Sequence, residues 1–315
     1  MSDITFGAVA SQTGVDWRDL LALWQELDRS SRFDSLWVVD HFVTGFGTAF
    51  GSEGQCLESW AALAALAQAT SRVRVGVLVS GNTYRHPAVL AKQATTLDHI
   101  SGGRLALGIG AAWHTYEHQA FGIPFYTTRE RLERLDEAVQ VIKLLWTQPA
   151  PAFHGRYYQL DAPPYSPPNV QQPHPPILVG GGGERRTLRT AARYADICNV
   201  MGTPEEVAHK FQVLERHCRD VGRDPAAVRR TIQVPLWLTD DPAFKQRVLQ
   251  GMSVARGTSE EEAARSVLLG SVEEVKAQVR AYVDAGVEGF MLAQWPRFHR
   301  DTLLRFSEEV IPAFK

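Results

Sequence analysis

The chain has 315 residues, of which 44% are hydrophobic and 22% are charged, enough for one large barrel or for two ordinary domains. Its formal net charge of -2 gives no overall positive field, which argues against nucleic acid or an anionic membrane as a partner. Asp16, Arg18 and Asp19 interrupt any signal-peptide core, and apolar stretches such as 60–67 are too short to span a bilayer. Three cysteines without metal-type spacing favour a reducing compartment. We therefore expect a cytoplasmic protein without a membrane segment.

Strand-like and helix-like hydrophobic periods alternate along the whole chain. Strands are predicted over residues 4–9, 35–39, 73–79, 104–109, 177–179, 197–200, 231–238 and 287–292. Helices are predicted over residues 17–27, 59–69, 88–100, 129–146, 185–193, 204–220, 272–285 and 298–311. The pattern is that of one strand and one helix repeated eight times.

Repeated strand-helix units predict parallel strands joined by right-handed crossovers. Neither half of the chain carries a glycine fingerprint in its first crossover, so a (β/α)8 TIM barrel over residues 1–315 is favoured over two open sheets. Three longer segments, 42–58, 149–176 and 240–266, are expected to be insertions. The first follows a strand and should lie on the active face, whereas the second precedes a strand and fits either end of the barrel.

An ionisable pair, Asp40 and His41, comes directly after the second predicted strand. In a (β/α)8 barrel the active site lies at the carboxyl ends of the strands, so this pair is a candidate catalytic group. An ordinary histidine titrates near neutral pH, which allows His41 to give or take a proton, and Asp40 is placed to orient it. The alternative is a polar pair that only caps the strand.

A run of four glycines, 180–183, follows the fifth strand and opens a helix. Bare backbone at a helix N-terminus can surround an anion such as a phosphate, and Arg185 and Arg186 are near enough in sequence to add positive charge. The alternative is a flexible turn flanked by two solvated arginines.

Two further patterns suggest ligands. The segment His114-Thr-Tyr-Glu117-His118 matches the H-x-x-E-H pattern of a class of zinc hydrolases, in which both histidines hold zinc and the glutamate activates water. Without a third ligand such a short pattern is weak. Aromatic residues after the strands are also suited to the wall of a pocket for a flat ring system; they are Phe42, Phe46, Phe50, Tyr84 and Trp113.

Taken together, four segments resemble the bacterial-luciferase-like superfamily and, within it, the coenzyme F420-dependent oxidoreductases. These segments are Leu36-Trp-Val-Val-Asp-His-Phe42, 82–92, 97–110 and 177–186. The resemblance implies a (β/α)8 barrel that binds a flavin or deazaflavin at the carboxyl ends of its strands. It also implies that Asp40 and His41 lie beside the ring, with His41 in proton transfer.

The same resemblance implies the remaining cofactor contacts. Family members often carry a non-proline cis peptide beneath the ring at the position of Leu78, Val79 and Ser80, and a phosphate loop at the position of the glycine run. The expected cofactor-binding residues are therefore Asp40, Leu78, Val79, Ser80, Asn82, Trp113, Gly181, Gly182, Gly183 and Arg185.

The chain departs from the related sugar-phosphate dehydrogenases at two positions. Gly45 and Phe46 stand where those enzymes have a tryptophan, and their acidic residue after the fourth strand falls near Trp113. A sugar phosphate substrate is therefore not implied, and His114 and Glu117 are nearby candidates for the missing group.

We expect hydride transfer between F420 and a small organic substrate, with Arg185, Arg186 and Arg189 favouring the acidic tail of the coenzyme. An FMN-dependent monooxygenase is the main alternative. A zinc hydrolase and a non-catalytic flavin-binding protein are more remote alternatives. Family members often dimerise, so a homodimer is expected.

Overall fold

Eight parallel strands form a closed barrel in the structure, a computed structural model that describes residues 4–44, 54–294 and 299–315. The strands, in order around the barrel, are β1 (Thr5–Val9), β2 (Ser35–Val38), β3 (Arg74–Val77), β5 (Leu105–Gly110), β8 (Ile177–Gly180), β9 (Ile197–Val200), β10 (Arg229–Leu238) and β12 (Gly289–Ala293). Strand β12 pairs with β1 and strand β9 with β10, which closes the ring. The predicted TIM barrel is therefore confirmed.

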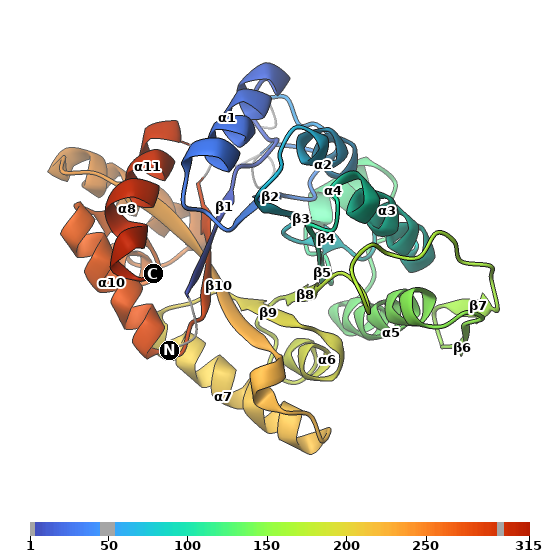
Figure 1. The fold of residues 1–315 in the computed structure, drawn as a ribbon. Coiled ribbons are helices and arrows are strands. Elements are labelled where there is room, and N and C mark those ends of the chain that lie inside the picture. The colour runs from blue at the N-terminus through green and yellow to red at the C-terminus, as the bar shows by residue number, and fades with distance from the viewer. Residues whose placement is uncertain (1–3, 45–53, 295–298) are drawn as a thin grey trace.

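Helices surround these strands on the outside of the barrel (Figure 1). One follows each strand in the chain: α1 (Trp17–Ser30), α2 (Ser59–Gln68), α3 (Pro87–Ile100), α5 (Thr128–Thr147), α6 (Thr187–Tyr194), α7 (Pro204–Asp220), α10 (Val272–Asp284) and α11 (Arg300–Arg305). Several of these helices begin at a residue whose side chain caps the helix N-terminus. On α7, for example, Thr203 and Glu206 form a reciprocal capping box. A π-helical turn (Phe306–Val310) continues α11. No helix in the described ranges combines the length and the apolar character needed to cross a membrane.

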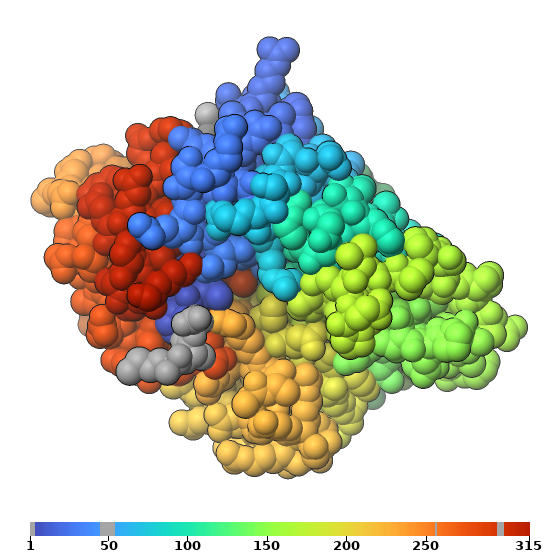
Figure 2. Space-filling model, viewed as in Figure 1, coloured from blue at the N-terminus to red at the C-terminus, as the bar shows by residue number. Residues whose placement is uncertain are grey.

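Two of the predicted insertions, 149–176 and 240–266, contain regular structure of their own, whereas most of the first, 42–58, lies outside the described residues. Residues 149–176 include an antiparallel hairpin of β6 (Ala152–His154) and β7 (Gln159–Asp161), which with α5 forms the projection at the right of Figure 2. This segment reaches both ends of the barrel: Tyr158 meets Asn82 after β3, whereas Gln171 donates to the carbonyl of Leu105 at the start of β5.

Several elements were missed by the prediction; all of them except the 15-residue α8 are too short to show a hydrophobic period. They are β4 (Ser80–Gly81), α4 (Thr115–Ala120), α8 (Pro242–Arg256), α9 (Glu260–Ala264) and β11 (Leu268–Gly270). Elements α8, α9 and β11 lie in or just after the insertion that follows β10.

The barrel interior is filled around Trp37, which is 1% exposed and donates from Nε1 to Ser35 Oγ at 2.8 Å. Its indole lies where the neighbouring strands carry glycine. A Cβ added at Gly7 would lie 2.8 Å from Trp37 Nε1, and a Cβ added at Gly76 would collide with the indole ring. The large side chain on β2 therefore requires small residues on β1 and β3.

We predict that Gly76→Ala lowers the free energy of unfolding by about 3 kcal/mol, because the added methyl group overpacks the core. It would also lie 2.6 Å from the carbonyl oxygen of Ala106. Gly251→Ala is the matched control, since a Cβ at Gly251 on α8 meets nothing within 4 Å. That variant should gain up to about 1 kcal/mol from helix propensity. Urea unfolding of both variants tests this, and equal effects would contradict the packing account.

Candidate active site

Asp40, at the carboxyl end of β2, is 4% exposed and surrounded by donors. Its carboxylate accepts from both terminal nitrogens of Arg85, at 2.6 and 3.0 Å, and from Ser59 Oγ and the backbone N–H of Gly81. These contacts fasten the start of α2 and strand β4 to the end of β2. Among the described residues no hydrogen bond joins the side chains of Asp40 and His41, so the predicted catalytic role of Asp40 stays a prediction.

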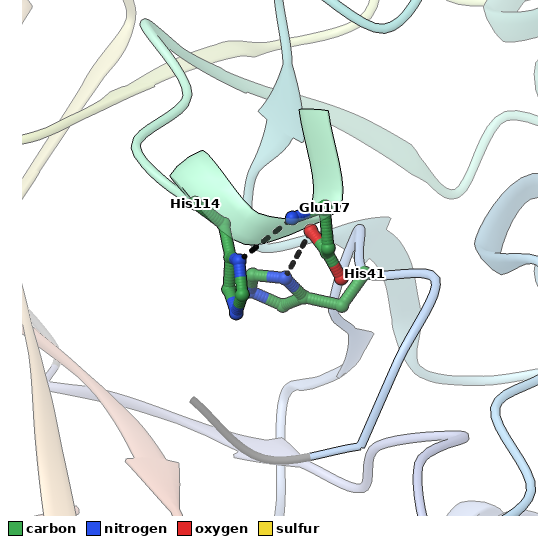
Figure 3. A group of neighbouring side chains, drawn as sticks. All are labelled: His41, His114 and Glu117. Carbon is green, nitrogen blue, oxygen red and sulfur yellow. Dashed lines mark hydrogen bonds and ion pairs between the residues drawn. The ribbon is translucent and has the colours of Figure 1, made fainter. Parts of the chain in front are cut away.

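Glu117, on α4, is the residue that holds His41. Its carboxylate is fully buried and accepts four hydrogen bonds. Oε2 accepts from His41 Nδ1 at 3.0 Å and from Tyr84 Oη at 2.5 Å, and Oε1 accepts from the backbone N–H groups of Phe42 and Val43 at 2.7 and 3.1 Å. An ionised carboxylate only accepts, so Nδ1 of His41 carries the hydrogen (Figure 3).

The surroundings of Glu117 keep its carboxylate ionised. Burial by itself would raise the pKa of Glu117, but the hydrogen bond and charge of His41, together with Tyr84 and the N–H of Phe42, lower it to about 2. Burial and the bond to Glu117 raise the pKa of Tyr84 far above its usual range, so the phenol stays protonated and donates. Burial and the charges of Glu117 and Asp40 raise the pKa of Cys56 to about 12, which keeps the thiol from acting as a nucleophile.

The H-x-x-E-H pattern does not converge on one point. His118 Nε2 lies 2.7 Å from Thr83 Oγ1, and its Nδ1 donates to the carbonyl of His114. The three residues whose ligand-type atoms lie within 4.8 Å of one another are instead His41, His114 and Glu117 (Figure 3). The four donors around Glu117 already occupy both of its oxygens, and His114 Nδ1 accepts the N–H of Glu117. Hydrogen bonding therefore accounts for this grouping.

The end of β3 has the form expected from the resemblance. The peptide between Leu78 and Val79 is cis. The side chain of Val79 lies against the neighbouring strands β5 and β8, where a Cβ on Gly110 would be 2.7 Å from it and a Cβ on Gly180 2.8 Å. Ser80, on β4, is fully buried and accepts from Trp60 Nε1.

Two predicted ring contacts lie at this face of the barrel. Asn82 is 2% exposed and donates from Nδ2 to Tyr158 Oη at 3.3 Å, while its Oδ1 has no hydrogen-bond partner within the described ranges. Trp113 is 54% exposed, and its ring centroid lies 5.7 Å from that of His41. A buried acceptor and an exposed aromatic surface are both suited to a flat heterocycle. Phe46 and Phe50 lie outside the described residues.

The glycine run forms a loop between β8 and α6. Gly181 has a φ of +129°, a backbone conformation that residues with a side chain rarely adopt. A Cβ on Gly183 would lie 2.9 Å from Thr187 Oγ1. A Cβ on Gly182 would lie 3.0 Å from Cε of Lys210, which extends from α7. Arg185 is exposed beside the loop. The loop therefore presents backbone without side chains. The cationic side chain of Lys210, which the sequence did not predict at this place, lies against Gly182.

A cavity of about 520 Å³ lies at the ends of β9 and β10. Thr258, Glu262, Arg265 and Ser266 line it from the third insertion, and Glu205 and Glu206 line it from α7. Arg265 lies 3.1 Å from Glu205, so the one arginine among these residues is already paired with a carboxylate. Among the charged residues of the lining the glutamates therefore outnumber the arginine by three to one.

His41 and the glycine loop both follow barrel strands, as expected, and their roles stay predictions; the sequence did not indicate which residues contact them. Glu117 was predicted as a nearby candidate or a zinc-site base, and it lies 76 residues from the histidine that it binds. No sequence pattern could have indicated the contacts of Arg85 with Asp40, of Tyr84 with Glu117 and of Lys210 with Gly182.

Comparison with known proteins shows the family to which the chain belongs. The family model described as luciferase-like monooxygenase matches residues 2–289. An F420-dependent glucose-6-phosphate dehydrogenase of Kineococcus radiotolerans is 32% identical over 308 residues, covering 90% of this chain and 89% of that protein. An FMNH(2)-dependent dimethylsulfone monooxygenase of Pseudomonas putida is 33% identical over 151 residues, covering 48% of this chain and 41% of that protein.

The solved structure of an F420-dependent secondary alcohol dehydrogenase, in complex with an F420-acetone adduct, superposes with a TM-score of 0.87 at 21% identity. It covers 99% of both chains and therefore supports the fold. The chain belongs to the luciferase-like family, and the predicted family and enzyme class are confirmed.

We predict that Glu117→Gln lowers the free energy of unfolding by about 3 kcal/mol, because an amide replaces an acceptor that four donors require. Glu309→Gln, at an exposed residue 2.9 Å from Arg305, is the control and should cost less than about 1 kcal/mol. Urea unfolding at neutral pH measures both.

The effect of Glu117 should depend on pH with a defined sign. Its pKa is lowered on folding, so its contribution is fully present above the ordinary value of 4.5 and is lost as the pH falls toward about 2. The difference between the native protein and Glu117→Gln should stay constant from pH 7 to about pH 5 and shrink below that. A difference that grows on acidification would contradict this assignment.

Proposed function

We propose that the chain is an F420-dependent oxidoreductase that transfers a hydride between the deazaflavin and a small organic substrate at the barrel mouth. The observation that carries the proposal is the juxtaposition of His41, fixed by Glu117, with the bare glycine loop on the same face. The relatives that share most of the chain's length support F420 over FMN. A cytoplasmic homodimer stays part of this proposal.

The residues present fit this cofactor. The backbone of Gly181, Gly182 and Gly183, the N-terminus of α6 and the Lys210 ammonium would hold the phosphate. The buried Oδ1 of Asn82 offers an acceptor to a ring N–H, and the exposed face of Trp113 offers a wall. When bound, the deazaflavin ring supplies the hydride acceptor or donor.

His41 would move the proton that accompanies hydride transfer. Nδ1 is committed to Glu117, so Nε2 is the atom that can accept a proton from a substrate hydroxyl or return one to a carbonyl. The histidine side chain is 24% exposed, and its Nε2 has no hydrogen-bond partner among the described residues. Glu117 would fix the tautomer and stabilise the imidazolium.

The cavity at the ends of β9 and β10 would receive the substrate. Three glutamates and one paired arginine there disfavour a phosphate dianion. We therefore propose an uncharged organic substrate, such as an alcohol or a carbonyl compound, instead of a sugar phosphate.

We predict that the purified protein binds F420 with micromolar or lower Kd and binds FMN much more weakly. Fluorescence titration with each cofactor measures this. Micromolar binding of FMN with none of F420 would contradict the proposal and favour the monooxygenase alternative.

We predict that His41→Ala leaves the Kd for F420 nearly unchanged and lowers turnover by about 10²- to 10⁴-fold, since general acid-base catalysis contributes that much. The assay follows F420 absorbance with secondary alcohols, ketones and glucose 6-phosphate, with and without a chelator. Chelator sensitivity would support the zinc alternative. Tight F420 binding without turnover on any substrate would support a non-catalytic binding protein.

A further inference from the structure

Strands β9 and β10 lie side by side in the barrel (Figure 1), and the cavity at their ends is lined partly by residues of β10. Ile232 and Val234 of this strand belong to the hydrophobic core that also contains the buried faces of the helices. Because side chains alternate along a strand, Gln233 points into the barrel interior. The register agrees, since Gln233 lies opposite Met291 of β12, which belongs to the core cluster around Trp37. The cavity therefore opens into the barrel interior, with Gln233 in its wall.

The carboxylates of this cavity already bind groups of the protein. Glu206 Oε2 accepts from the backbone N–H of Thr203 at 2.9 Å, and Glu262 Oε2 accepts from that of Ser259 at 3.1 Å. Each of these bonds belongs to a capping box that begins a helix. The third glutamate is the one paired with Arg265. All four charged groups of the lining therefore have partners within the protein.

The side chain of Gln233 differs from these groups. It is partly buried, and its amide forms no hydrogen bond within the described ranges. The hydroxyl of Thr258 likewise forms none there, but Thr258 lies on the loop after α8, whereas Gln233 is held by a barrel strand. A group on a strand is positioned more precisely than a group on a loop. Gln233 thus offers the cavity an uncharged group that can both donate and accept a hydrogen bond.

We propose that Gln233 is a specificity-determining residue that binds a second hydroxyl group of the substrate, in addition to the hydroxyl or carbonyl group that reacts. This inference rests on the proposed function and names a substrate class for the same site, a diol or a hydroxyketone. A hydroxyl suits the amide because both groups donate and accept and neither is charged. A substrate without this hydroxyl would leave the amide unpaired and would react less efficiently.

The test compares three secondary alcohols with the three diols that differ from them by one terminal hydroxyl. The shortest pair is isopropanol and propylene glycol; in the longer diols one or two methylene groups separate the carbons that carry the hydroxyls. Oxidised F420 is the hydride acceptor, and its absorbance gives kcat and KM. The native protein should oxidise at least one diol with a kcat/KM about tenfold above that of its matched alcohol, the effect of one additional hydrogen bond.

Gln233→Met keeps the length of the side chain without its hydrogen bonding and should abolish this preference for the diol. Gln68→Met, at an exposed residue at the end of α2, is the matched control and should retain the preference. Urea unfolding separates specificity from a structural role. Because the amide of Gln233 bonds to no other residue in the described part of the chain, Gln233→Met should unfold at the same urea concentration as the native protein. A lower midpoint would show that the amide supports the fold instead.

Three kinetic results would overturn the assignment while leaving F420 binding in place. They are equal kcat/KM values of the native protein within every pair, a preference for the diol that survives in Gln233→Met, and an absence of turnover with all six compounds. Failure of the native protein to bind F420 would instead overturn the proposed function itself.

Discussion

The buried carboxylate of Glu117 is the constraint on which the rest of the barrel mouth depends. It brings together the chain after β2, the chain after β4 and helix α4, through His41, Tyr84 and two backbone N–H groups. Removing a carboxylate from water is costly unless donors replace the lost hydration, and here four donors do so. Because Glu117 keeps its negative charge, it accepts a hydrogen bond from Nδ1 of His41. This bond fixes the orientation and the tautomer of the imidazole ring.

A second carboxylate, that of Asp40, stabilises the loops around the residue that precedes His41. It receives Arg85, Ser59 and Gly81, which fixes the start of α2 and strand β4 against the end of β2. The adjacent residues Asp40 and His41 thus belong to two separate networks. One network holds the loops in place, and the other presents an imidazole nitrogen to the mouth.

Charge is divided across the mouth. Bare backbone and Lys210 lie at the end of β8, whereas the charged residues that line the cavity at the ends of β9 and β10 are three glutamates and one paired arginine. The glycine loop with Lys210 therefore favours an anionic cofactor, and the cavity at the ends of β9 and β10 favours an uncharged substrate. This division supports a phosphate-bearing cofactor and argues against a phosphorylated substrate, although the glucose-6-phosphate dehydrogenase of Kineococcus is similar over most of the chain.

The strands, the helices and the barrel could be predicted because each is set by local hydrophobic period and by turn residues. The position of His41 and of the glycine loop followed from their place after strands. Contacts between residues that are distant in sequence could not be predicted. Glu117 is 76 residues from His41. Trp37 meets Gly7 and Gly76 only because β1, β2 and β3 are neighbours in the barrel. Elements of two to six residues, such as β4 and α4, were missed because they are shorter than the period that would reveal them.

The most direct test of this account is an experimental structure of the protein crystallised with F420. We expect a phosphate against Gly181, Gly182 and Gly183, a ring beside Asn82 and Trp113, and a His41 whose Nδ1 is bonded to Glu117 and whose Nε2 faces the ring. A phosphate bound away from the glycine loop, or a His41 side chain out of reach of the ring and the substrate, would contradict it.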